Sequence, residues 1–148
     1  MNLQPIFWGG LIAGILDITA ACLTAWLRRG ISPAAVLRYV ASGVLGPAAA
    51  RGGIETALLG LALHFVIATG AAAVFYFASR KWLFLVERPV LFGLLYGIPV
   101  YLFMTYVVLP LSRVARGPAT LSGTIIGVVT LMLCIGLPIA LIVRRYSR

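Results

Sequence analysis

The chain has 148 residues, of which 62% are hydrophobic and 10% are charged, and its formal net charge is +9. Ordinary soluble domains carry about 25% charged residues, so this composition excludes a soluble globular protein. The twelve Lys and Arg residues lie at the ends of apolar stretches or in the loops between them. This placement favours membrane lipids as partners and excludes nucleic acid.

Four apolar stretches are each long enough to cross a bilayer, because a spanning helix needs about 20 apolar residues. They cover about residues 5–27, 54–79, 89–111 and 120–143. Every connection except the first is short, which makes consecutive spans antiparallel neighbours. The sequence therefore predicts an all-α membrane protein, in which residues 1–148 form a single four-helix transmembrane bundle.

The first stretch has a tryptophan near each end. Trp8 and Trp26 lie roughly 27 Å apart along a helix, which is close to the thickness of the hydrocarbon layer. Tryptophan favours the boundary between lipid tails and headgroups, so the pair marks both interfaces. Asp17 is the only charged residue of this stretch and lies midway between them.

The first connection contains a helix start signal. Ser32 can cap a helix, and Pro33 fits a first helical turn. The pattern predicts a short helix over about residues 33–45, with Arg38 away from its apolar stripe. That stripe consists of Val36, Leu37, Val40 and Val44. The helix is too short to span, so it is interfacial or re-entrant, and we favour the interfacial placement.

One residue stands out in each of the next two stretches. His64 lies near the middle of the second stretch. Pro99 lies near the middle of the third, where it removes one backbone hydrogen bond and predicts a kink. The Lys and Arg residues divide six to six between the two sides of the membrane. The positive-inside rule therefore leaves the orientation open.

Small residues recur at helical spacing in three of the stretches. In lipid, helices associate through close backbone approach rather than through the hydrophobic effect. The predicted packing glycines are Gly10, Gly14, Gly93, Gly97, Gly123 and Gly127. We favour contacts within the bundle, and the alternative is contact between chains in a homo-oligomer or a larger membrane complex.

Asp17 and His64 are the only acidic or basic side chains well inside the stretches. A charge at the centre of a bilayer costs about 2.5–3.5 kcal/mol, so such residues turn inward and find partners. Their similar depth predicts a polar pair within hydrogen-bond reach, directly or through one water. We favour a structural pair that fixes helix register, with proton or substrate handling as the main alternative.

No residue pattern indicates catalysis. The sequence has no nucleophile with a recognisable base, and it has no Gly-rich phosphate loop. His64 lacks a second metal ligand, and Cys22 and Cys134 are not in metal-ligand spacing. We therefore expect no enzymatic activity, no metal and no cofactor.

Several apolar segments, at residues 9–17, 59–65, 96–101 and 108–112, resemble a known family. They are similar to the small uncharacterised bacterial inner-membrane proteins of the YagU type and their shorter relatives. The resemblance covers most of the chain and implies a multi-pass protein of the bacterial cytoplasmic membrane. It implies no activity and no catalytic residues.

The favoured interpretation is an accessory or interaction protein of the bacterial inner membrane. One alternative is a small proton-coupled transporter or channel that uses Asp17, and another is lipid or quinone binding between the spans. A cavity beside Asp17 that opens to one side would favour transport. A filled bundle with a flat outer face of small residues would favour the accessory role.

Overall fold

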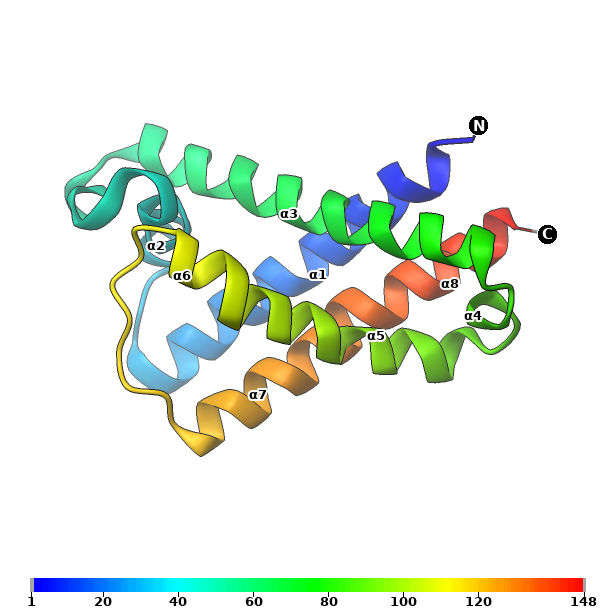
Figure 1. The fold of residues 1–148 in the computed structure, drawn as a ribbon. Coiled ribbons are helices and arrows are strands. Elements are labelled where there is room, and N and C mark those ends of the chain that lie inside the picture. The colour runs from blue at the N-terminus through cyan, green and yellow to red at the C-terminus, as the bar shows by residue number, and fades with distance from the viewer. Residues whose placement is uncertain (1, 148) are drawn as a thin grey trace.

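The computed structural model describes residues 2–147, and every regular element in that range is a helix (Figure 1). Four helical rods are long and apolar enough to cross a membrane. They are Gln4–Arg29, Ile54–Lys81, Pro89–Leu111 and Leu121–Tyr146. The predicted all-α class with four spans is confirmed, and the rods indicate a multi-pass membrane protein.

Helix α1 (Gln4–Arg29) runs the length of the molecule (Figure 1). It begins with Pro5 in its first turn, where the missing N–H costs no helical hydrogen bond. It ends at Gly30, whose φ of 63° is left-handed and whose N–H donates to the carbonyls of Ala25 and Trp26. Glycine takes up this conformation without the steric cost of a side chain.

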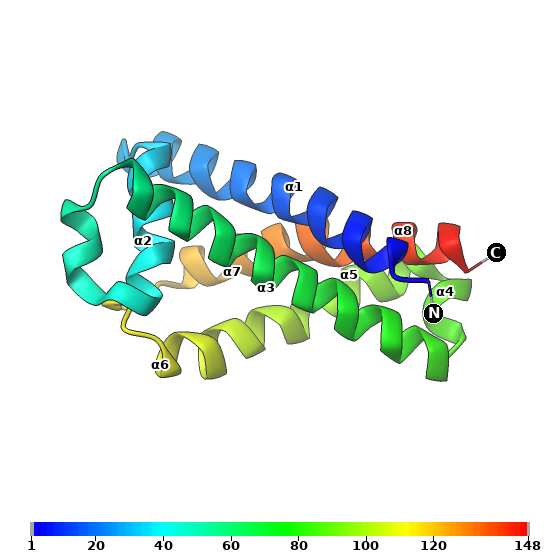
Figure 2. The same ribbon diagram turned by 90° about the horizontal axis from the view of Figure 1, so that it is seen from above.

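Helix α2 (Pro33–Leu45) begins where the sequence predicts it, with the Ser32 hydroxyl accepting a hydrogen bond from the Ala35 N–H at 3.3 Å. It lies across one end of the bundle in both views (Figures 1 and 2). A 3₁₀ turn, η1 (Gly46–Arg51), follows it. Ala41 is fully buried, and α2 packs on α3.

The second span is helix α3 (Ile54–Lys81), and the short helix α4 (Phe84–Glu87) connects it to α5 (Pro89–Phe103). Helix α1 packs on α3 and on α8 (Leu137–Tyr146) of the fourth span. Helix α5 packs on all three parts of that span, which are α7 (Leu121–Leu131), η3 (Met132–Gly136) and α8. A side-chain hydrogen bond joins spans two and three: the Tyr96 hydroxyl donates to the Ala71 carbonyl at 2.8 Å. The ring of Tyr96 also packs edge-on against Phe75.

The third and fourth spans each contain a π-helical turn directly before a Leu-Pro pair. In the third span, η2 (Met104–Val108) precedes α6 (Leu109–Leu111). In the fourth span, α7 (Leu121–Leu131) leads through η3 (Met132–Gly136) to α8 (Leu137–Tyr146).

Proline lacks an N–H, and its ring presses on the carbonyl four residues earlier, so a widened turn relieves the clash. The departures from α-helical winding thus lie before Pro110 and Pro138. Pro99 lies inside the continuous α5, and its kink stays a prediction.

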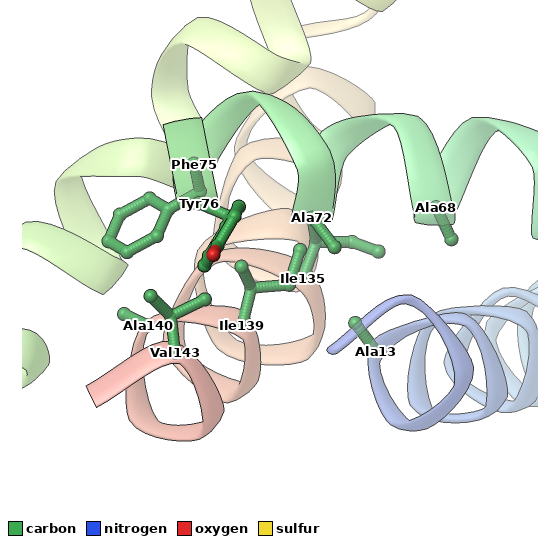
Figure 3. Packing of buried hydrophobic residues seen from close by; sticks show 9 residues of the cluster. All are labelled: Ala13, Ala68, Ala72, Phe75, Tyr76, Ile135, Ile139, Ala140 and Val143. Atoms are coloured by element: carbon green, nitrogen blue, oxygen red, sulfur yellow. The ribbon is translucent and has the colours of Figure 1, made fainter. Parts of the chain in front are cut away.

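The hydrophobic core lies where α1, α3, η3 and α8 meet (Figure 3). Alanines from α1 and α3 allow the helices to approach, and larger side chains fill the remaining space. The cluster consists of Ala13, Ala68, Ala72, Phe75, Tyr76, Ile135, Ile139, Ala140 and Val143.

Phe75→Ala should remove the largest fully buried side chain of this core, which is 1% exposed. In soluble cores such a change costs about 3–5 kcal/mol of unfolding free energy. Part of that cost comes from moving the side chain between water and the core, and this part is absent in lipid. We expect a loss of about 2 kcal/mol, measured as reduced unfolding free energy in mixed micelles. Phe77→Ala is the matched control, because Phe77 is 51% exposed on the same helix. Equal losses in both variants would contradict this core.

The glycine contacts agree with most of the predicted packing set. A side-chain carbon added at Gly10 or Gly14 would meet α3, and one at Gly93 or Gly97 would meet the fourth span. At Gly127 it would lie 2.9 Å from the Tyr101 ring.

Gly123 is the exception, because its only close neighbour is the capping hydroxyl of Thr120 on its own helix. A helix–helix contact at Gly123 stays a prediction. Two of the closest backbone approaches involve glycines outside the predicted set. They are Gly60 against Leu37 of α2, and Gly136 against Gly93.

Candidate functional site

Asp17 lines a hollow of about 440 Å³ that opens at the surface of the bundle. We call it the Asp17 hollow. Its walls come from the C-terminal half of α1, from α5, η2 and α6, and from α7. Most of the wall is apolar. Four of the lining residues carry a hydroxyl group: Thr24, Tyr101, Thr105 and Thr130.

One face of α1 forms the floor of the hollow. Asp17, Ala21, Ala25 and Arg29 all line it and follow each other at every fourth position, which places them on one side of a helix. At about 1.5 Å per residue, this stripe runs roughly 18 Å from mid-span to the last turn of α1. The two alanines are small, so the helix leaves space where larger side chains would fill it.

Two arginines line the hollow at the end of α1. They are Arg28 and Arg29. The Arg28 guanidinium donates a hydrogen bond to the Ser122 hydroxyl at 3.3 Å, joining the end of α1 to the start of α7. Helix α7 itself is capped by Thr120, whose hydroxyl accepts from the Gly123 N–H at 3.1 Å. Arg28 therefore holds two walls together, whereas Arg29 belongs to the floor.

His64 lies on α3 and contacts α1 one turn before Asp17. Its Nε2 is 2.9 Å from the Gly14 carbonyl oxygen. A carbonyl oxygen can only accept, so Nε2 carries the hydrogen in this contact. The expected direct hydrogen bond to Asp17 is not among those formed within residues 2–147, and the Nε2 of His64 donates to the backbone. Contact through one water stays a prediction.

A double-mutant cycle tests whether the two side chains interact, using Asp17→Asn, His64→Leu and both changes together. We expect His64→Leu to cost about 0.6–1.7 kcal/mol, the range for interhelical hydrogen bonds in membranes. Contact through one water predicts that the double change costs less than the sum of the two single changes, because each single change then leaves a polar group without its partner.

The matched control for the cycle is His64→Gln, whose amide can still donate to the Gly14 carbonyl. It should retain more stability than His64→Leu in the same melting measurement. Strictly additive losses in the cycle would show that Asp17 and His64 act separately.

A second opening lies between α3 and the third span. This groove has a volume of about 540 Å³ and an almost entirely apolar wall that includes Gly70, Tyr96 and Pro99. A carbon added at Gly70 would meet nothing within 4 Å, so this glycine faces open space. The groove has no acidic or basic lining residue, which distinguishes it from the Asp17 hollow.

Sequence reasoning identified Asp17 but missed the residues that complete its hollow. Arg29 and Ala25 lie at multiples of four from Asp17, which is a signal that the sequence does carry. Thr105 and Tyr101 belong to the third span. They line the hollow only because of how that span packs against α1 and α7, which no sequence pattern marks. No cluster of three or more His, Cys, Asp or Glu residues that could hold a metal lies within residues 2–147.

The wall of the hollow thus contains a mid-span carboxyl group, four residues with hydroxyl groups and two arginines. Such a site can bind a small solute and can take up or release a proton at the carboxyl group. The resemblance to proteins of the YagU type stays a prediction. The chain matches no protein-family model, no curated protein and no solved structure.

Proposed function

We propose that this chain is a small proton-coupled transporter or channel of the bacterial inner membrane, with Asp17 as the group that carries the proton. The observation that supports the proposal is the open hollow that Asp17 lines. An acidic residue in the middle of a span is costly and marks function by default. A purely structural carboxyl group would be expected to have its oxygens satisfied by neighbouring helices instead of facing a cavity.

The chemistry of the hollow suits coupling between a proton and a solute. The carboxyl group can change charge when the hollow admits water, and the neutral form is favoured when water is excluded. Hydroxyl groups of Thr24 and Thr130 offer hydrogen bonds to a solute of either charge. The hollow reaches about half of the span, so transport needs a further opening on the opposite side.

Purified protein in liposomes tests the proposal. The liposomes contain a pH-sensitive dye and receive either a proton gradient alone or one of three solutes: tetramethylammonium, methanesulfonate or betaine. Each solute carries at least one permanently ionised group, so it crosses the lipid only slowly without a carrier. We expect faster pH change than in empty liposomes in at least one condition. Rates equal to those of empty liposomes in all four conditions would contradict the proposal.

An accessory role without enzymatic activity is the second candidate function. The groove beside Gly70 favours it, because a small residue that faces open space lets another helix approach closely. The liposome experiment separates the two candidates. An accessory subunit would leave the pH unchanged in every condition, whereas a transporter would act without a partner.

A further inference from the structure

We propose that the pocket between α1 and α2 binds the phosphate headgroup of an anionic phospholipid. This pocket, the α1–α2 pocket, has a volume of about 640 Å³. Arg29 of α1 and Arg38 of α2 both line it, together with Tyr39 and Ser42. No Asp or Glu residue is among those that form its wall, so its charged side chains are all positive.

The two arginines come from different helices, and only Arg38 is held by a hydrogen bond. Arg38 is partly buried, and its Nη1 donates a hydrogen bond to the Gly52 carbonyl at 3.1 Å. A guanidinium has five N–H donors, so this bond leaves others for a ligand. Arg29 makes no side-chain hydrogen bond within the described part of the chain, and its guanidinium can turn toward the pocket. Arginine suits phosphate because its planar fork can donate two parallel hydrogen bonds.

The remaining wall favours a lipid over a soluble anion. Besides the arginines, it is largely apolar, with Ile31, Val36 and Pro47 among its residues. A soluble anion would gain only the charge contacts there, whereas a phospholipid also places the beginning of its acyl chains on apolar surface. The pocket lies at the end of α1, where arginines and the exposed Trp26 mark the expected level of the headgroups.

The lipid site does not depend on the proposed transport. It adjoins the Asp17 hollow, because Ala21, Ala25, Arg29 and Ile31 line both openings. A phospholipid in the α1–α2 pocket would therefore lie beside the hollow. Phospholipid binding is measured without any transport of protons or solutes. The lipid proposal and the transport proposal can therefore fail independently.

Native mass spectrometry of the purified full chain, after exchange into phosphatidylglycerol or phosphatidylcholine micelles, tests the site. We expect retained phosphatidylglycerol and little phosphatidylcholine. Arg29→Gln and Arg38→Gln should each reduce phosphatidylglycerol binding about fivefold, the effect of one basic residue near an anionic lipid. Arg51→Gln and Arg116→Gln are the controls, since they remove the same charge at the same end of the bundle but do not line the pocket.

Three results would overturn the proposal. One is equal retention of both lipids, and another is an equal loss of binding in the control variants. The third is displacement of the lipid by millimolar inorganic phosphate, which would indicate a site for a soluble anion. If Arg38→Gln fails to fold, Arg29→Gln decides the matter alone, because Arg29 makes no side-chain hydrogen bond within residues 2–147.

Discussion

Asp17→Asn is expected to reduce proton movement in liposomes at least tenfold. Asparagine keeps the size of the side chain but cannot bind and release a proton near neutral pH. The loss should therefore appear in the rate and not in the folding of the protein. The measurement is the initial rate of dye response in the condition that gives the fastest wild-type signal.

Asp17→Glu is the matched control, because it keeps the carboxyl group and adds one methylene. It should retain a measurable fraction of the wild-type rate, since the hollow has room for a slightly longer side chain. Melting curves of both variants show whether folding is intact. Full activity of Asp17→Asn with a normal melting curve would remove Asp17 from the mechanism.

Gly97→Ala is expected to lower the melting temperature by roughly 5–10 °C, although it adds only one methyl group. The added carbon would overlap the backbone of Met132 at the start of η3. A backbone cannot rotate away as the end of a side chain can, so α5 and the fourth span must separate. Overpacking typically costs about 1–3 kcal/mol, and contact with backbone puts this case at the upper end.

Gly70→Ala adds the same methyl group at the centre of another span and serves as the control. Nothing lies within 4 Å of the added carbon there. Alanine forms helix better than glycine by about 0.5–1 kcal/mol, so this variant should melt at the wild-type temperature or slightly above it. Melting in detergent, followed by circular dichroism, compares the two. If Gly97→Ala melted no lower than Gly70→Ala, the close crossing of α5 and η3 would be refuted.

The spans could be predicted from the sequence because hydropathy depends on composition alone. The predicted second span, residues 54–79, differs from Ile54–Lys81 only at its C-terminal end. The start of α2 was equally predictable, because the Ser32 cap and Pro33 act within a single turn. These features need no knowledge of what packs against them.

The arrangement of the spans could not be predicted in the same way. A stripe of small residues shows that a helix can approach another, but it does not say which one. Gly127 meets a tyrosine ring, Gly123 meets only its own helix cap, and Gly60 meets the short helix α2. His64 likewise bonds a backbone carbonyl, a partner that every residue offers and that no sequence pattern marks.

The uneven burial along the fourth span has a consequence for how the protein fluctuates. Helix α7 has no buried residue, whereas α8 buries Ile139, Ala140 and Val143. Local opening is least costly where few buried contacts must break. Backbone amides of α7 should therefore exchange with deuterium sooner than those of α8, with η3 as the boundary between them. The α8 end of the bundle then stays packed, whereas the α7 end can open locally without unfolding of the whole protein.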